Sequence, residues 1–163
     1  MRNLTTPIND EDLKNLRVGD HITISGTMYT GRDAALPQLV ELIKKDEVPI
    51  DLNGTAIMHT AFSEAGIAPT TSNQEEIESA IPALSKAGVK VHIGKGMLSN
   101  NTILSLKENN SIFVITPPVA ALLTNKVLEK KCVLFEHEGM EAMFELKVKK
   151  IPGIVAVRDG KSI

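Results

Sequence analysis

SIFVITP, at residues 111–117, is the stretch that most constrains the fold of this chain. Its nearly uninterrupted apolar run predicts a strand buried on both faces, as in the centre of a parallel sheet. Thr116 followed by Pro117 is typical of a helix N-terminus, because proline is tolerated at the first helical position. We therefore expect a buried strand followed by a helix that ends near Lys130. The residues at helical spacing on its inner face are Val119, Leu122, Leu123 and Val127.

The same alternation of strand and helix extends along most of the chain. Apolar runs bounded by turn residues predict further strands at residues 21–26, 55–62, 89–93, 132–135, 144–149 and 154–157. Helical spacing predicts helices that begin near residues 32–36, at 74–87 and around 102–108. In the second helix, Ser72 and Glu75 fit a capping box, Pro82 predicts a kink or a split, and Gly88 follows the end.

This order of elements indicates an α/β fold in which at least part of the sheet is parallel. The chain has 163 residues, and it contains no internal repeat, low-complexity segment or linker. We therefore expect a single domain that spans residues 1–163.

Composition and charge exclude several classes of function. The net charge is −2, and the chain has four Phe, one Tyr and no Trp, so we expect no nucleic-acid binding. No apolar run reaches the roughly 18 residues of a membrane span, and the polar, acidic N-terminus is no signal peptide. The single cysteine, Cys132, fits a reducing compartment. We expect a cytoplasmic protein without membrane contact.

Metal chemistry is not expected of this chain alone. An iron–sulfur cluster normally needs several thiolates, and a structural zinc site needs several Cys or His ligands. One cysteine and four histidines without ligand-like spacing supply neither.

Three short polar segments lie where a strand would lead into a helix, which is a common place for ligands in α/β folds. In the first, Tyr29–Asp33, Arg32 could clamp a carboxylate through two N–H groups. Alternatively, Arg32 is an ordinary surface side chain, and Asp33 favours the helix dipole.

The second segment, Pro69–Ser72, places three hydroxyl groups before a helix, where they could bind a carboxylate or a phosphate. Capping by Ser72 explains the same pattern. The third segment, Ile93–Gly96, flanks Lys95 with glycines, so the ammonium group could reach a ligand. A plain turn is the alternative, and the segment lacks the spacing of a phosphate-binding Walker A loop.

The other polar or reactive side chains have structural explanations. His92 alternates with apolar neighbours, so we expect it to face away from the core. His59 fits a buried, hydrogen-bonded imidazole. Cys132 is expected to act as a small hydrophobic residue at the start of a strand, and Met140 and Met143 as core residues.

Taken together and in order, these segments resemble the β subunit of two-subunit class I fumarases and L-tartrate dehydratases. The similarity covers nearly the whole chain. It includes Leu4–Ile8, Leu16–Asp20, Gly26, Tyr29–Thr30, Arg32–Ala35, Asp51–Gly54, Pro69–Ser72, Gly94–Gly96, Gly139–Ala142 and Pro152–Asp159.

The resemblance implies a swivelling β/β/α domain with a mixed sheet and flanking helices. It also implies a partner α subunit that holds a [4Fe-4S] cluster, while this chain binds no cofactor. The reaction would be the reversible hydration of a dicarboxylate, such as fumarate to malate, or the dehydration of tartrate. The isolated chain is expected to pair with the α subunit or with itself.

The resemblance also assigns roles to single residues. Arg32 matches a substrate-binding arginine, Thr70 the threonine proposed as the catalytic base, and Ser72 and Lys95 substrate contacts. Lys95, beside Arg32, would stabilise the alkoxide form of Thr70. Gln74 stands where the family usually has a further carboxylate-binding arginine.

Leu36 stands where the family has a histidine. These departures keep open an alternative, a non-catalytic anion-binding relative with a different ligand. A third hypothesis is a small-molecule module that acts alone. The retained residues Arg32, Thr70, Ser72 and Lys95 favour the hydro-lyase subunit.

Overall fold

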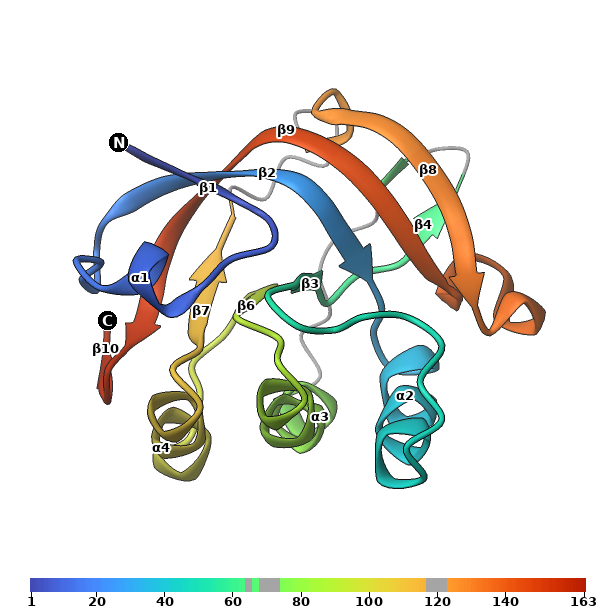
Figure 1. Cartoon of the computed structure of the whole chain (residues 1–163), viewed down its shortest axis with the longest axis horizontal. Coiled ribbons are helices and arrows are strands. Elements are labelled where there is room, and N and C mark those ends of the chain that lie inside the picture. The colour runs from blue at the N-terminus through green and yellow to red at the C-terminus, as the bar shows by residue number, and fades with distance from the viewer. Residues whose placement is uncertain (64–65, 68–73, 117–122) are drawn as a thin grey trace.

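The computed structural model describes residues 1–63, 66–67, 74–116 and 123–163 (Figure 1). Its strands are β1 (Arg2–Thr5), β2 (His21–Thr30), β3 (Ala56–Met58), β4 (Phe62–Ser63), β5 (Gly66–Ile67), β6 (Val91–Gly94), β7 (Ile112–Ile115), β8 (Val127–Leu134), β9 (Met143–Arg158) and β10 (Lys161–Ser162). Its helices are α1 (Asp10–Leu13), α2 (Ala35–Lys44), α3 (Gln74–Lys86), α4 (Asn100–Glu108) and the 3-10 helix η1 (Glu136–Glu141). A curved sheet lies over a row formed by α2, α3 and α4 (Figure 1).

The sheet is mixed and closes on itself. Its parallel strands are ordered β1-β2-β3-β6-β7. β9 pairs antiparallel with both β7 and β2, and this double pairing closes β2, β3, β6, β7 and β9 into a barrel. β8 and β10 are added to β9. The predicted class, α/β with a partly parallel sheet, is confirmed.

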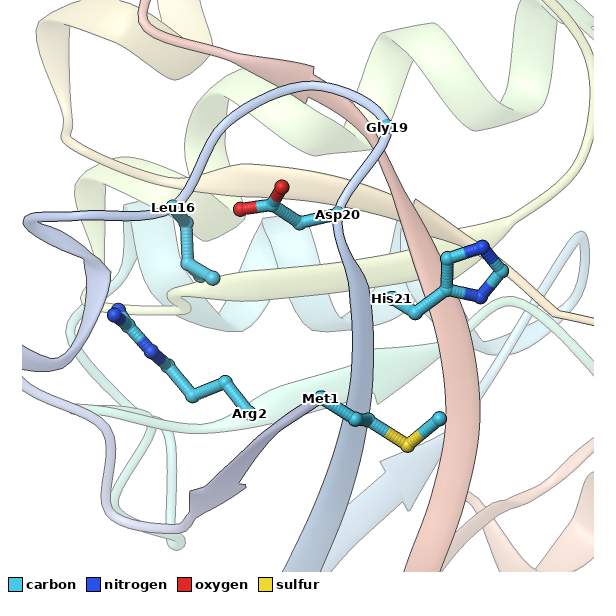
Figure 2. Close-up of a pocket in the computed structure, with 6 residues that line it drawn as sticks. All are labelled: Met1, Arg2, Leu16, Gly19, Asp20 and His21. Atoms are coloured by element: carbon cyan, nitrogen blue, oxygen red, sulfur yellow. The ribbon is translucent and has the colours of Figure 1, made fainter.

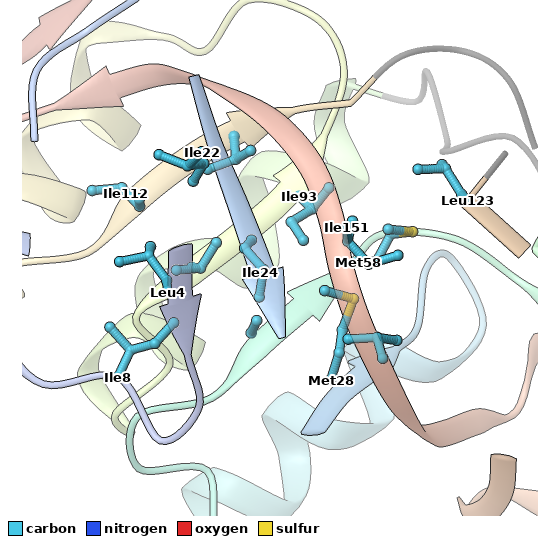
Figure 3. Packing of buried hydrophobic residues seen from close by; sticks show 14 of the residues in the cluster. Leu4, Ile8, Ile22, Ile24, Met28, Met58, Ile93, Ile112, Leu123 and Ile151 are labelled. Atoms are coloured by element: carbon cyan, nitrogen blue, oxygen red, sulfur yellow. The ribbon is translucent and has the colours of Figure 1, made fainter. Parts of the chain in front are cut away.

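Alternate residues of the parallel strands face two different apolar layers. One set fills the barrel, as Figure 3 shows for Leu4, Ile22, Ile24, Met28, Met58, Ile93, Ile112 and Ile151. The residues between them face the helices: Ile57 packs with Leu39 and Leu84, and Phe113 packs with Leu106. Both faces of these strands are therefore buried, which explains the nearly continuous apolar sequence of β7.

β2 is longer than the predicted strand at residues 21–26, because it continues to Thr30. Its register with β9 shifts between Ile24 and Gly26, and Gly26 has a positive φ of 104°. A Cβ atom at Gly26 would lie 2.4 Å from Thr6 Oγ1, and the N–H of Thr27 donates to that oxygen at 2.6 Å. The absence of a side chain at Gly26 thus lets the N-terminal segment approach β2.

Two predictions for the C-terminal part of the chain are wrong. Residues 127–130, expected to end a helix, begin strand β8, which pairs with β9; residues 117–122 lie outside the described part. The separate strands predicted at 144–149 and 154–157 are one 16-residue strand, β9. Residues 151–153 of β9 pair with β2 alone, so Pro152 interrupts no ladder on the other side.

The helices begin and end close to their predicted places. α2 begins at Ala35, and α4 begins at Asn100 after the N-cap residue Ser99. α3 is not split by Pro82, whose ring lies on the exposed side. Gly88 follows α3 with a φ of 115°, as expected for a helix C-terminus. The predicted cap residue Ser72 lies outside the described residues.

Two side chains are more exposed than the sequence predicts. Met143 is fully buried, but Met140 is 47% exposed. Cys132 lies within β8 rather than at its start and is exposed. None of the helices in the described part of the chain is long and apolar enough to cross a membrane.

Candidate functional site

The carboxyl ends of the parallel strands meet at one edge of the barrel. Thr30 at the end of β2 pairs with Met58 at the end of β3, and Met58 pairs with Ile93 of β6. Gly94 at the end of β6 in turn pairs with Ile115 at the end of β7. The residues that follow these ends share this edge, called here the carboxyl edge. Parallel topology thus brings the first and third predicted polar segments together.

Arg32 lies in the turn between β2 and α2. The N–H of the preceding residue, Gly31, donates to the Met58 carbonyl at 3.1 Å, which ties this turn to the end of β3. The Arg32 guanidinium donates from Nε to both carboxylate oxygens of Glu141, at 2.8 and 3.1 Å, and its Nη2 lies 2.7 Å from Oε2. This fork-like contact fixes the plane of the guanidinium.

The ion pair between Arg32 and Glu141 is largely covered. Each side chain is 25% exposed, and the hydrogen bonds that Arg32 donates to Glu141 raise the pKa of Arg32 above its ordinary value. A second contact links the same elements, because Gln38 Nε2 of α2 donates to Glu138 Oε1 of η1 at 3.4 Å. Sequence reasoning gave Glu141 no role, although Gly139–Ala142 was one of the segments that carry the resemblance.

Lys95 lies in the exposed turn after β6, between Gly94 and Gly96. Gly96 has a positive φ of 97°, and a Cβ atom at Gly94 would lie 3.2 Å from Phe113 Cζ. The backbone conformation at Gly96 and the close packing at Gly94 thus each favour glycine. Lys95 makes no hydrogen bond or ion pair with the described residues, so its ammonium group is available to a ligand.

The remaining predicted site residues follow β3 and precede α3. Thr70 and Ser72 lie outside the described residues, and Gln74 is the first residue of α3, with its side chain not described. The N–H of Gly54, just before β3, donates to the carbonyl of Gly88, just after α3, at 2.8 Å. α3 thus ends at the amino edge of the sheet and begins at the carboxyl edge. The roles predicted for Thr70, Ser72 and Gln74 stay predictions.

Two histidines of the carboxyl half of the sheet differ from their predicted settings. His92 does face away from the barrel interior, but α3 covers it and it is 0% exposed. Its Nε2 lies 2.8 Å from Ser85 Oγ, and its Nδ1 lies 3.4 Å from His59 Nε2. His59 is also 0% exposed, and its Nδ1 has no hydrogen-bond partner in the described structure. His59 is buried as predicted, but only one of its two ring nitrogens has a hydrogen-bond partner in the described structure.

Burial dominates the titration of this pair. It lowers the pKa of His59 to about 4 and the pKa of His92 well below its ordinary value, and the nearby His59 lowers that of His92 further. Both imidazoles are therefore neutral near pH 7. Neutral rings can each donate one hydrogen bond and accept another.

The described part of the chain has several surface cavities. One of about 830 Å³ is lined by Met1, Arg2, Leu16, Gly19, Asp20 and His21 (Figure 2). It lies at the amino end of β2, opposite the carboxyl edge, and Asp20 there accepts from the Arg17 N–H at 2.9 Å. A second, of about 390 Å³, is lined by Phe62, Ser63, Lys130, Lys131, Cys132, Met140 and Phe144.

The chain does not fit an iron–sulfur cluster. It has one cysteine, exposed on β8, whereas such clusters are held by about four thiolates. Within the described ranges, no three His, Cys, Asp or Glu side chains come together as a possible metal site.

Comparison with known proteins shows the family of this chain. The family model described as Fumarase C-terminus matches residues 2–163. The L(+)-tartrate dehydratase subunit beta of Escherichia coli (strain K12) is 35% identical over 167 residues, which cover 94% of this chain and 81% of that protein. A protein of Geobacillus stearothermophilus named "Putative fumarate hydratase class I" is 31% identical over 166 residues, 94% of this chain and 31% of that protein.

These relatives are named as dehydratases or hydratases, which indicates a family of hydro-lyases. The chain belongs to the Fumarase C-terminus family, and it is of the β-subunit type found in class I fumarases and L-tartrate dehydratases.

Proposed function

We propose that this chain is the β subunit of a two-subunit hydro-lyase that reversibly hydrates or dehydrates a dicarboxylate, such as fumarate and malate or tartrate. The observation that carries the proposal is the shared position of Arg32 and Lys95 at the carboxyl edge. Two cations at one edge, Arg32 held by Glu141 and Lys95 exposed, are suited to a substrate with two carboxylates. The names of the relatives supply the reaction class.

Each site residue has a distinct part in this proposal. Arg32, oriented by Glu141, binds one carboxylate, and the exposed Lys95 binds the other. Thr70 is the base at C3 of the substrate, and its hydroxyl loses a proton more readily when cations stabilise the alkoxide. Ser72 and Gln74 contribute neutral hydrogen bonds to the substrate.

The cofactor belongs to the partner in this proposal. Because this chain cannot hold a [4Fe-4S] cluster, the cluster would lie on an α subunit of a cytoplasmic hetero-oligomer. This chain then acts as a swivelling domain that closes over the partner's site, supplies the charged edge and excludes water. The "subunit beta" in the name of the E. coli relative supports a partner chain.

Two residues favour a second candidate, a divergent anion-binding relative with a different ligand. Gln74 replaces a carboxylate-binding arginine of the family, and loss of one such charged hydrogen-bonding group costs about 1.5–3 kcal/mol of binding. Leu36, in place of a histidine, is 2% exposed and packs with the helix-facing core. It therefore serves stability rather than ligand binding.

The test is anaerobic co-expression of the chain with a candidate α subunit, followed by absorbance assays with fumarate, malate and L(+)-tartrate. We expect a co-purifying complex with hydro-lyase activity on at least one of them. Lys95→Ala should remove the activity. Lys45→Ala, an exposed lysine just after α2, is the matched control and should retain it. A complex that is inactive on all three substrates favours the anion-binding relative, and a chain that never associates contradicts the subunit role.

A further inference from the structure

Ser85, His92 and His59 form a buried row between the sheet and α3. Their exposed fractions are 3%, 0% and 0%. The row is joined by the Ser85 Oγ to His92 Nε2 contact of 2.8 Å and the His92 Nδ1 to His59 Nε2 contact of 3.4 Å. It ends at His59 Nδ1, which is the only buried side-chain N or O atom in the described part of the chain without a partner.

Counting donors and acceptors determines which group donates in each hydrogen bond of this row. The Ser85 hydroxyl hydrogen bonds only to His92 among the described residues, so it must donate to His92 Nε2 or leave its own proton unpaired. When Ser85 donates, His92 carries its proton on Nδ1 and donates to His59 Nε2. His59 then carries its proton on Nδ1. If instead His59 donates to His92 and His92 donates to Ser85, two groups lack a hydrogen-bond partner, the Ser85 proton and the His59 Nδ1 lone pair. Buried polar groups without a partner are unfavourable.

The backbone at His59, the last residue of the row, is tied to the segments that lead into the two cationic turns. The carbonyl of Met58, which precedes His59, accepts from Gly31 next to Arg32 at 3.1 Å. The N–H of His59 itself donates to the Ile93 carbonyl, two residues before Lys95, at 2.8 Å. His59 is therefore the first residue after β3, held by backbone bonds to the segments that carry Arg32 and Lys95.

We propose that His59 is a further substrate-binding residue, whose Nδ1–H donates a hydrogen bond to a carboxylate oxygen of the substrate. Ser85 and His92 are positioning residues that hold His59 in the tautomer with a proton on Nδ1. This proposal rests on the proposed hydro-lyase function, because it gives that substrate a third contact between Arg32 and Lys95.

The chemistry suits a donor that is neutral and desolvated. Because its pKa is lowered to about 4, His59 donates without adding a third positive charge to the edge. A hydrogen bond to a carboxylate is stronger in a covered site than in water. Since Nδ1 is covered in the unliganded chain, the turns at the edge must separate to admit the oxygen. The substrate then satisfies a donor that has no other described partner.

The first experiment locates the imidazole protons without any assay of activity. Long-range proton–nitrogen NMR spectra of the full chain at pH 7 should show both His59 and His92 protonated on Nδ1. His59 protonated on Nε2 overturns the proposal, whatever the α subunit does. In Ser85→Ala the His92 tautomer should no longer be fixed, whereas an unchanged His92 spectrum would contradict the positioning role of Ser85.

The second experiment compares two amide variants in the active complex. His59→Asn places an amide nitrogen near the position of Nδ1, whereas His59→Gln places it near Nε2 and removes the proposed donor. We expect KM for the substrate to rise roughly 10- to 150-fold in His59→Gln and clearly less in His59→Asn, with similar thermal stability. Equal KM values in the two variants would mean a structural role only and would overturn the proposal.

The failure of this proposal can be told apart from failure of the hydro-lyase function. If no active complex forms, the hydro-lyase function fails, and millimolar L-malate and L(+)-tartrate are titrated into the isolated chain instead. A shift of the His59 Nδ1 and its proton in the chain, absent in a titration with sodium chloride, supports carboxylate binding by His59. No shift with either compound overturns it.

Discussion

The buried histidines should make the protein progressively less stable as the pH falls below 6.5. The pKa of His59 is lowered from 6.5 to about 4 in the folded chain, whereas in the unfolded chain it returns to its ordinary value. Between these two values the unfolded state binds a proton that the folded state does not. The contribution of His59 to stability is therefore complete above pH 6.5 and is lost as the pH falls toward 4.

The loss can be calculated from the two pKa values. For His59 alone it is about 2 kcal/mol at pH 5 and about 3 kcal/mol at pH 4, since one pKa unit corresponds to about 1.4 kcal/mol. His92 is shifted in the same direction and adds to the loss. The pKa of Asp10 is lowered from 3.8 by its hydrogen bonds to Lys90 and Asn110. The stability that Asp10 contributes is therefore lost mainly as the pH falls below 3.8, outside this range.

Urea unfolding at several pH values from 7 to 4.5 measures this loss directly. We expect the unfolding free energy of the wild type to fall across this range and the slope to be smaller in His59→Asn. His21→Asn is the control, because His21 is exposed at the start of β2 and its side chain makes no hydrogen bond or ion pair with the described residues, and it should keep the wild-type slope. A wild-type stability that is flat between pH 6.5 and 4.5 would refute the argument, because a neutral buried imidazole cannot then be present.

Three further predictions concern the carboxyl edge. Lys95→Ala should abolish turnover in the complex while circular dichroism shows an unchanged fold, because the exposed Lys95 makes no hydrogen bond or ion pair with the described residues; normal turnover would remove its assigned role. Gln74→Arg should lower KM for fumarate by roughly 10- to 150-fold through a new charged hydrogen bond, and an unchanged KM would mean that the start of α3 is not arranged as in the family. Glu141→Gln should raise KM because it removes the ion pair that orients the Arg32 guanidinium, and it should lower the unfolding free energy in urea by about 1.5–3 kcal/mol because a largely covered, charged hydrogen-bonded pair is lost; unchanged KM would show that Arg32 does not need Glu141 for its orientation.

The fold was predictable where local pattern and long-range pairing agree. The apolar run of β7 and the helix starts at Ala35 and Asn100 follow from local sequence, and their order already indicates a parallel sheet. Closure into a barrel was not predictable, because it depends on β9 pairing with both β2 and β7. The predicted strand at residues 132–135 covers only the second half of β8, and the start of β8 at Val127 was not predictable for the same reason. Val127 continues a helical spacing, but pairing with β9 decides its conformation.

The histidines show the limit of alternation as evidence for exposure. Alternation in β6 correctly places Val91 and Ile93 on one side and His92 on the other. It cannot show that a helix covers the second side. Ser85 of α3 is the hydrogen-bond partner that offsets the free-energy cost of burying His92. The local sequence of β6 gives no indication of that partner.

The contrast between local pattern and long-range contact also separates the predicted from the missed residues of the candidate site. Arg32 and Lys95 could be found because each follows a recognisable strand, and the ends of parallel strands meet at one edge whatever the details of packing. Glu141 could not be found from its surroundings, since its contact with Arg32 joins residues 109 positions apart. Glu141 ends η1, the segment that connects the paired strands β8 and β9, and this pairing was not predicted. The sequence predicted the second half of β8, at residues 132–135, but neither its start at Val127 nor its pairing with β9. Without that pairing, nothing in the sequence places Glu141 beside Arg32.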